Sequence, residues 1–194
     1  MRVGYVEIEN FRGIKQLRWA PAGGINCLIG PGDSCKTTIL DAVALALSPR
    51  HTLSFDDLDF FGGDFKNAAK IIVTLTDLPD EFISDSAYAS YLRGISNDGK
   101  VVDEPPLPEN GQLALSIMFS IDEGLEGTWT LWNERVAADD LKQRSLSYAH
   151  RSAVAPARLG VYADRHLSWG RNSTLSRMSE GAAGTQDILA RAGR

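Results

Sequence analysis

Cysteine and histidine are scarce in this chain, with two cysteines and three histidines among 194 residues. Cys27 and Cys35 are too few for a disulfide framework, and no cysteines and histidines are grouped at the spacing of a zinc site. The chain also lacks the run of about 18 uncharged apolar residues that a membrane-spanning helix needs. These absences argue against a disulfide-stapled domain, a structural metal site and a membrane protein.

The N-terminus does not have the pattern of a secretory signal, because its first ten residues include Glu7 and Glu9 and no continuous apolar stretch. Apolar residues make up 43% of the chain and charged residues 23%, a composition that can bury a sizeable core. We therefore expect a cytoplasmic globular protein without membrane contact, built as one domain over residues 1–194.

The charges are segregated along the chain, although the formal net charge is only −5. Residues 1–50 carry +2, residues 51–110 carry −8, residues 111–140 carry −5 and residues 141–194 carry +6. Eight of the nine bases in the last block are arginines, whose guanidinium groups suit bidentate contact with phosphates. This end is a candidate for DNA contact, and the alternatives are a solvated face or a partner for the acidic middle.

The opening of the chain predicts a β-hairpin, a loop and a helix. Within residues 2–9, Val6 and Ile8 alternate with Glu7 and Glu9, which favours a half-buried strand. Residues 14–19 predict its hairpin partner. Residues 25–29 form a short apolar run bounded by glycine, as expected of a strand buried on both faces. Residues 36–47 predict a helix that Ser48 and Pro49 end.

Downstream, residues 80–93 predict a short helix that Gly94 ends, and residues 94–111 are rich in proline, glycine and asparagine. We interpret that second stretch as a long surface loop. The remaining expected strands are residues 70–76, 112–121, 128–132 and 158–164. The second and third of them predict an antiparallel pair joined by an acidic turn.

The most informative segment is residues 30–37, Gly-Pro-Gly-Asp-Ser-Cys-Lys-Thr, which stands between an expected strand and an expected helix. A phosphate-binding loop surrounds a polyphosphate with backbone N–H groups and the N-terminus of the next helix. Lys36 would reach the β- and γ-phosphates, and the Thr37 hydroxyl would be a ligand of Mg²⁺. The expected contact residues are Gly30, Pro31, Gly32, Asp33, Ser34, Cys35, Lys36, Thr37 and Thr38.

Cys35 departs from the pattern G-x-x-x-x-G-K-[ST], which has glycine at this position. If the position requires positive φ, a Cβ there costs about 1–2 kcal/mol and weakens the phosphate cradle. The alternative is a tight strand-to-helix turn with a capping Ser34. Under the phosphate-loop hypothesis, Lys36 would be an exposed loop charge in the empty protein. A redox-gated site is a further hypothesis, because a thiol beside a lysine at a helix N-terminus is prone to oxidation. The alternative is that Cys35 is simply a small residue that fits.

The order of motifs resembles the N-terminal ATPase half of the OLD (overcoming lysogenization defect) family, related to the RecF and SMC type of ABC ATPases. The resemblance rests on Ile8-Glu9-Asn10-Phe11-Arg12-Gly13-Ile14, on residues 25–37, and on Leu40-Asp41-Ala42. It is specific over residues 3–47 and looser over residues 48–61, where residues 53–60 resemble the acidic Asp-Phe segment of OLD proteins.

This resemblance implies ATP and Mg²⁺ as cofactors and a homo-oligomer in which ATPase heads dimerise around two ATP molecules. It also implies action on DNA, because full-length OLD proteins carry a C-terminal Toprim domain whose carboxylates bind metal and cut DNA, and a role in antiviral defence. Arg12 matches the arginine that approaches the nucleotide in RecF and SMC heads. The alternative is that Arg12 is a surface residue beside Glu9.

Parts of a complete ABC ATPase are not evident. Such an enzyme needs an apolar strand that ends in Asp-Glu, whereas Asp164 ends a candidate strand with Arg165 in the place of the glutamate. Residues 168–170 and 176–181 are weak candidates for the signature motif. No Toprim-like carboxylate set occurs before Arg194, so we expect a fragment or a split gene product whose nuclease domain lies elsewhere.

We therefore predict an α/β fold, a P-loop NTPase of the ABC-ATPase-head type, with a mixed sheet and an antiparallel β portion. Residues 1–61 would hold the hairpin, the P-loop and the first helix, residues 62–140 strands and an acidic insert, and residues 141–194 an Arg-rich segment. The expected function is Mg-ATP binding coupled to action on DNA, with weak or partner-dependent hydrolysis. The alternative is a non-hydrolysing nucleotide-sensing or interaction module, and a small P-loop kinase or GTPase is a third reading.

Overall fold

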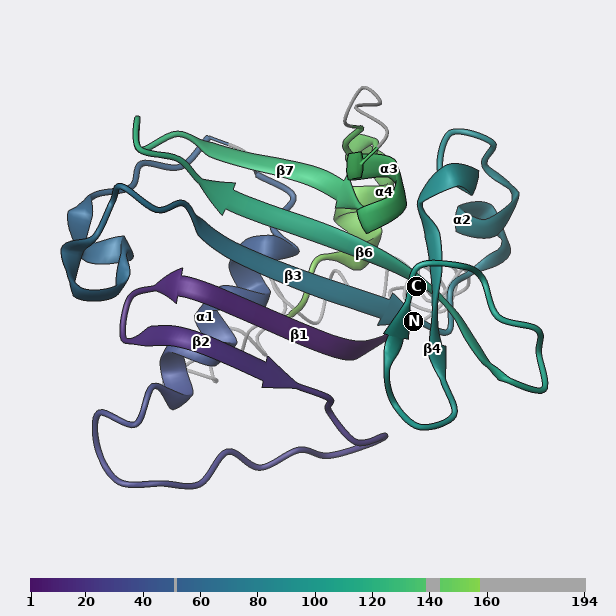
Figure 1. Ribbon diagram of the computed structural model, residues 1–194, viewed down its shortest axis with the longest axis horizontal. Helices are drawn as coiled ribbons and strands as arrows, with labels where there is room; N and C mark the ends of the chain where they lie inside the picture. The colour runs from purple at the N-terminus through teal and green to yellow at the C-terminus, as the bar shows by residue number, and fades with distance from the viewer. Residues whose placement is uncertain (51, 139–143, 158–194) are drawn as a thin grey trace, which may run out of the picture. The chain divides into compact units, whose positions relative to one another are not determined.

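The computed structural model describes residues 1–50, 52–138 and 144–157. The chain divides into two compact units, Met1–Ala155 and Pro156–Arg194, and the elements below belong to the first. Its centre is a seven-stranded sheet in the order β2-β1-β3-β6-β4-β5, with β7 paired to β6 (Figure 1). The strands are β1 Arg2–Phe11, β2 Ile14–Trp19, β3 Ala69–Thr76, β4 Leu92–Ser96, β5 Val101–Val102, β6 Gly111–Ile121 and β7 Gly127–Trp132.

Every pairing between these strands is antiparallel. The long strand β6 pairs with β3 along one edge, while β4 and β7 divide its other edge between them. The antiparallel portion predicted from the sequence is confirmed, but the described strands contain no parallel pair that would make the sheet mixed.

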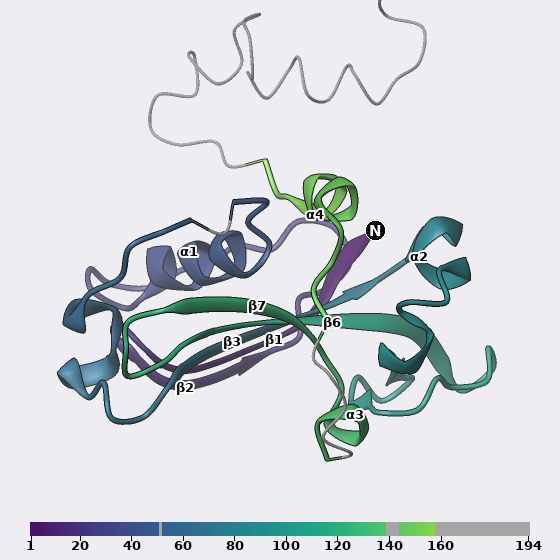
Figure 2. The same ribbon diagram turned by 90° about the horizontal axis from the view of Figure 1, so that it is seen from above.

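The helices lie on the faces and at one end of the sheet. Figure 2 shows α1 and α4 on one face and α3 on the other. The helices are α1 Lys36–Ala46, α2 Asp80–Ser84, α3 Glu134–Ala138 and α4 Tyr148–Val154, and short 3-10 turns are η1 Asp57–Asp59, η2 Phe61–Gly63 and η3 Ala89–Tyr91.

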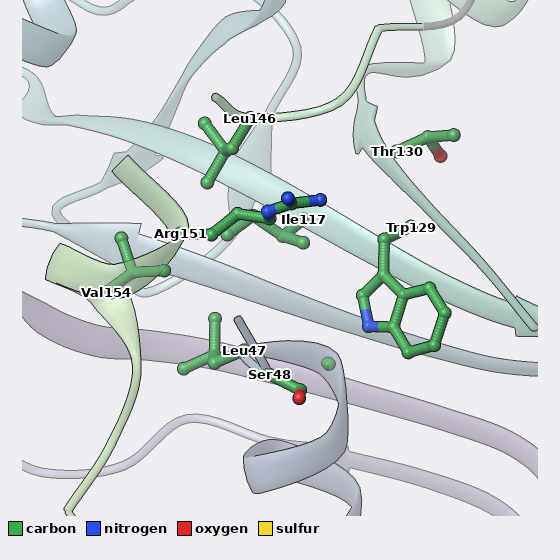
Figure 3. Close-up of a pocket in the computed structure, with 9 residues that line it drawn as sticks. Leu47, Ser48, Ile117, Trp129, Thr130, Leu146, Arg151 and Val154 are labelled. Atoms are coloured by element: carbon green, nitrogen blue, oxygen red, sulfur yellow. The ribbon is translucent and has the colours of Figure 1, made fainter. Parts of the chain in front are cut away.

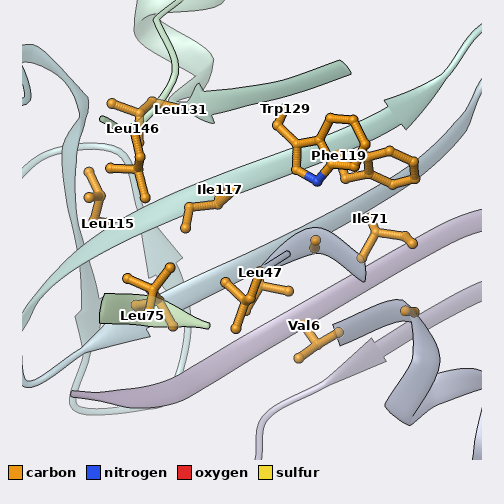
Figure 4. Close-up of a cluster of buried hydrophobic side chains, with 14 of the residues drawn as sticks. Val6, Leu47, Ile71, Leu75, Leu115, Ile117, Phe119, Trp129, Leu131 and Leu146 are labelled. Atoms are coloured by element: carbon orange, nitrogen blue, oxygen red, sulfur yellow. The ribbon is translucent and has the colours of Figure 1, made fainter. Parts of the chain in front are cut away.

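Alternation along the strands produces the core between the sheet and α1. In β1, Val6 and Ile8 are fully buried, whereas Glu7 and Glu9 on the opposite face are partly or largely exposed. The alternation continues over residues 69–73 of β3 and in β7, whereas residues 114–119 of β6 are buried on both faces. Each buried apolar side chain contributes about 1.5–3 kcal/mol. Figure 4 shows this cluster, which includes Val6, Leu47, Ile71, Leu75, Leu115, Ile117, Phe119, Trp129, Leu131 and Leu146.

Helix α1 packs on this cluster through one stripe. Ala42 and Ala46 are buried, and Ile39 and Val43 pack partly buried beside them, which is the i, i+3, i+4, i+7 spacing of a helical face. The indole N–H of Trp129 donates to the Leu45 carbonyl at 3.0 Å and so satisfies a carbonyl at the helix end. The predicted helix over residues 36–47 is therefore confirmed to within one residue.

The strand expected at residues 25–29 is wrong. The segment forms no strand, and Ile25 and Ile29 are 93% and 92% exposed. The Asn26 side chain accepts from the Ala22 N–H and donates to the Ala22 and Gly24 carbonyls, which closes a turn on residues 22–26. An apolar run becomes a strand only beside a pairing neighbour, and none of the described strands pairs with this segment.

The helix expected over residues 80–93 is also wrong beyond Ser84, because residues 89–91 form a 3-10 turn and β4 begins at Leu92. Gly94 therefore ends no helix; it lies inside β4, opposite Leu113 of β6. The expected loop over residues 94–111 contains most of the β4–β5 hairpin, and residues 97–100 and 103–110 lie outside strands. Long-range pairing with β6 decided the structure here against the local signal at Gly94.

The other described strands agree with the sequence. The hairpin of β1 and β2, the strand β3 and the antiparallel pair of β6 and β7 with its acidic turn are confirmed. The strand expected over residues 158–164 lies outside the described residues. Among the described helices, no helix has the length and apolar character needed to cross a membrane.

Gly94 gives a test of the strand assignment. A Cβ at this position would lie 2.1 Å from Cδ of Pro106, so Gly94→Ala should destabilise the fold by about 2 kcal/mol through overpacking. Gly32→Ala is the matched control, because a Cβ there meets nothing within 4 Å and its φ is not positive. Urea unfolding of both variants measures the difference, and equal midpoints would contradict the packing of β4 against the loop of Pro106.

Candidate phosphate-binding site

Residues 30–35 form the loop that leads into α1, which begins at Lys36. Residues 30–34 are exposed, and Cys35 and Lys36 are partly buried. The loop-to-helix junction predicted from the sequence is therefore present, but residues 25–29, which lead directly into the loop, form no strand.

The backbone of the loop takes the left-handed conformation at two residues that are not glycine. Asp33 has φ 57° and Cys35, the residue before the helix, has φ 58°. This conformation explains why the motif pattern has glycine at position 35, since a Cβ there costs about 1–2 kcal/mol. Position 35 therefore has the left-handed backbone conformation that glycine adopts easily, although the residue here is cysteine.

The ammonium group of Lys36 points back into its own loop. It donates to the Gly30 carbonyl at 3.0 Å, to the Ser34 hydroxyl at 2.9 Å and to the Pro31 carbonyl. The expectation of an exposed loop charge is thus wrong, because loop oxygens replace water around the cation. Contact with a phosphate requires the ammonium to exchange these oxygens for phosphate oxygens.

The N-terminus of α1 is the second feature of an anion site. Cys35 makes no side-chain capping bond, and no acidic residue lies in the first turn. The unpaired N–H groups of a first turn and the positive end of the helix dipole favour an anion. The alternative of a Ser34-capped turn is wrong in that detail, because the N-cap residue is Cys35. The Ser34 hydroxyl instead donates to the Pro31 carbonyl at 2.9 Å and accepts from the Lys36 ammonium.

The threonines of the first turn are the oxygen donors nearest the loop in sequence. Thr37 is exposed and Thr38 is partly buried. A hydroxyl suits Mg²⁺ as one ligand among waters and phosphate oxygens. The part of the chain that the structure describes holds no group of three or more His, Cys, Asp or Glu side chains that could bind a metal. The Thr37 hydroxyl fits Mg²⁺ as one ligand, with waters and phosphate oxygens as the others.

Arg12, the remaining candidate, is engaged with two carboxylates. Its NH1 lies 3.1 Å from Oδ2 of Asp41 on α1, and its Nε lies 2.9 Å from Oδ1 of Asp59 in η1. From the sequence, Arg12 was predicted either to contact a phosphate or to lie on the surface beside Glu9. Neither prediction included Asp41 or Asp59. Asp41 and Asp59 both lie in segments that carry the family resemblance, and this was the signal that could have identified them as partners of Arg12.

Cys35 contacts the turn between β1 and β2. Its thiol lies 3.4 Å from the Gly13 carbonyl, and a Cβ on Gly13 would come within 2.6 Å of the sulfur. The side chain at position 35 thus fills space against residues 22 positions earlier in the chain. This contact supports the view that a small side chain fits there, and the redox-gated site stays a hypothesis.

The enclosed cavity between α1, the sheet and α4 is not a nucleotide site. Figure 3 shows Leu47, Ile117, Trp129, Leu146 and Arg151 around it. Its internal space is about 10 Å³, which is close to the room for one water molecule. This cavity is therefore too small to hold a nucleotide.

The other residues considered from the sequence divide in two groups. His150 has a structural position: its Nδ1 lies 2.8 Å from the Tyr88 hydroxyl, and its ring centroid lies 4.5 Å from that of Phe82. The candidate Asp164 and the candidate signature segments, residues 168–170 and 176–181, lie outside the described residues, as do His51 and His166.

Substitutions at position 35 test the backbone strain. A β-branched residue tolerates the left-handed region poorly, so Cys35→Val should be less stable than Cys35→Gly by about 2 kcal/mol. Equilibrium urea unfolding of the two variants and the parent measures the difference. A Cys35→Val protein as stable as Cys35→Gly would contradict the left-handed conformation.

Known proteins share short stretches of sequence with this chain, and no protein-family model matches it. It is 43% identical over 53 residues to the DNA double-strand break repair Rad50 ATPase of Methanopyrus kandleri. It is 44% identical over 43 residues to the DNA replication and repair protein RecF of Prosthecochloris aestuarii, and 41% identical over 49 residues to an uncharacterized protein of Methanocaldococcus jannaschii.

These stretches are a small part of each protein. They cover 27%, 22% and 25% of this chain and 6%, 12% and 22% of the respective relatives. A solved structure of an SMC ATPase is similar with a TM-score of 0.47 and 13% sequence identity, over 78% of this chain and 76% of that one. The sequence similarity to Rad50 and RecF supports an ABC-type ATPase as the family of this chain.

Proposed function

We propose that this chain is an ATP-binding domain of ABC type that holds the phosphates of Mg-ATP on residues 30–38. The observation that carries the proposal is the left-handed backbone at Cys35 directly before the uncapped N-terminus of α1. The free N–H groups of the first turn and the Lys36 ammonium both lie at the end of this loop. Both are complements of a polyphosphate.

Each residue has a defined part in this proposal. Backbone N–H groups of the loop and of the first turn donate to phosphate oxygens, with Pro31 unable to contribute one. Lys36 leaves the Gly30 and Pro31 carbonyls and pairs with the phosphates. The Thr37 hydroxyl contributes one ligand to Mg²⁺, whose charge offsets that of the phosphates.

Two features of the loop lower the expected affinity. The Asp33 carboxylate adds a negative charge to an anion site, at a cost of about 1 kcal/mol for an exposed group near a phosphate. The three oxygens that hold Lys36 must also be exchanged before the ammonium can reach a ligand. We therefore expect binding in the micromolar range or weaker.

Beyond ATP, we propose a DNA-related function in a larger assembly. The names of two relatives, a double-strand break repair ATPase and a replication and repair protein, point to this class. Our finer proposal is an OLD-like ATP-dependent endonuclease that dimerises through its ATPase heads, with a nuclease domain outside residues 1–194. The Arg-rich residues 141–194 are the proposed DNA-contacting segment.

A nucleotide-sensing module without hydrolysis is the second candidate. It is favoured by the engagement of Lys36 with its own loop, which gives the nucleotide-free protein a distinct closed arrangement. Phosphate release measured beside ATP binding separates the two. Binding without turnover by the chain alone or with DNA favours the sensor, whereas DNA-stimulated turnover favours the ATPase.

Lys36→Ala tests the phosphate loop. Loss of a charge-assisted contact of about 2–3 kcal/mol should weaken Mg-ATP binding on the order of 30- to 100-fold, measured by isothermal titration calorimetry. Lys100→Ala is the matched control, because Lys100 is an exposed lysine paired with Asp98 in the β4–β5 hairpin. Unchanged affinity in Lys36→Ala, with an intact unfolding transition, would exclude the phosphate-loop proposal.

Thr37 gives a separate test of the magnesium ligand. In the parent chain Mg²⁺ should tighten ATP binding, and Thr37→Ala should remove most of that gain while leaving metal-free ATP binding unchanged. Thr37→Ser keeps the hydroxyl and should retain the gain. Titrations with and without Mg²⁺ measure it, and an identical gain in Thr37→Ala would assign the metal ligand elsewhere.

A further inference from the structure

The end of β1 and the turn that leads to β2, residues 10–13, contact segments that are far away in the sequence. The Asn10 side chain donates to the carbonyls of Asp64 at 3.0 Å and Asn67 at 2.6 Å. The fully buried Phe11 forms an isolated antiparallel bridge with Phe60. Residues 10 and 11 therefore contact residues 60–67, which follow α1 in the chain.

Arg12 extends these attachments to α1. Its backbone N–H donates to the Asp59 carbonyl at 3.0 Å, and its guanidinium lies between the carboxylates of Asp59 and Asp41 at 2.9 and 3.1 Å. The side chains of Asp59 and Asp41 are only 13% and 24% exposed, so water screens them less than it screens Arg12, at 42%. Without the guanidinium, these two partly buried carboxylates would lose the cation that they share.

These contacts reach the start of α1, where the proposed phosphate ligands lie. Asp41 follows Thr37 by four residues and therefore shares its helix face. The Cys35 thiol, at the N-cap, contacts the Gly13 carbonyl. Arg12 thus contacts the second turn of α1 through Asp41, and the adjacent Gly13 contacts the N-cap residue Cys35.

The turn is held in an unusual backbone conformation. Asn10 and Arg12, on either side of Phe11, have φ of 52° and 47°. Residues other than glycine keep such values only where the surrounding structure imposes them. The contacts of Asn10, Phe11 and Arg12 supply that constraint, so the shape of the turn and the placement of α1 depend on each other.

We propose that Arg12 is a positioning residue: by holding Asp41 and Asp59 together it aligns the N-terminus of α1, with Lys36 and Thr37, for phosphate binding. This inference rests on the proposed function. It assigns the charge of Arg12 to carboxylates of the protein, whereas direct contact with a nucleotide would require the guanidinium to leave both.

Arg12→Gln tests the role in binding. It should weaken Mg-ATP binding about tenfold, as losses of residues that orient a ligand-binding group do. Arg18→Gln is the matched control, since Arg18 pairs with Glu7 at 3.3 Å and is 62% exposed. Its affinity should equal that of the parent. If Arg12→Gln unfolds, Arg12→Lys replaces it and should lose affinity less, because a lysine cannot bridge both carboxylates in the same way.

A double-mutant cycle with Asp41→Asn separates positioning from direct contact. If Arg12 acts through Asp41, Asp41→Asn alone weakens binding, and adding Arg12→Gln changes it little further. If Arg12 contacts the nucleotide, Asp41→Asn leaves binding unchanged or tighter, and Arg12→Gln has its full effect in both backgrounds. The second, additive pattern would overturn the proposal.

Hydrogen exchange of the nucleotide-free protein provides a readout that does not need ATP. Arg12→Gln should speed exchange of the amides in residues 35–41 and leave the amides of β6 unchanged, while Arg18→Gln should alter neither. A parent chain that binds no ATP would refute the proposed function, and the exchange result would still decide the positioning role. Unchanged exchange in Arg12→Gln would refute that role whatever the parent binds.

Discussion

The placement of α1 on the sheet is the constraint on which the candidate site depends. Ala42 and Ala46 allow the helix to approach the buried faces of β1, β3 and β6 closely, and Trp129 holds the far end of the helix by a bond to Leu45. Because a helix is rigid over 11 residues, this packing also determines where its N-terminus lies. A loop of exposed residues thereby acquires a defined anchor at one end.

At the N-terminal end of α1, polar contacts add to the apolar packing of Cys35 and Ile39. Arg12 joins Asp41 and Asp59, and the Cys35 thiol meets the β1–β2 turn. Such contacts are directional and partly exposed, so they contribute less stability than the core but specify orientation. The division suits a binding loop, in which Lys36 must exchange its partners without disturbing the sheet. The strained residues Asp33 and Cys35 lie in the same loop.

Sequence patterns predicted the elements whose burial is periodic. The alternation of Val6 and Ile8 with two glutamates was enough to place β1, and the spacing of Ile39, Ala42, Val43 and Ala46 was enough to place α1. The patterns failed where pairing over a long distance competes with local signals. Gly94 has the local appearance of a helix end, yet its lack of a side chain lets Pro106 pack against β4.

For the site, the sequence by itself determined which groups are available: a lysine and a threonine at the start of a helix, after a loop of small and turn-forming residues. It also identified position 35 as the point of strain, because an αL backbone penalises any Cβ. Only the tertiary structure decided that Ile25 and Ile29 are exposed, that Lys36 is held by its own loop, and that Arg12 pairs with Asp41 and Asp59. Composition and spacing indicate what a segment can contact. The partners of Arg12, however, lie 29 and 47 positions away in the chain, and only the fold brings them beside it.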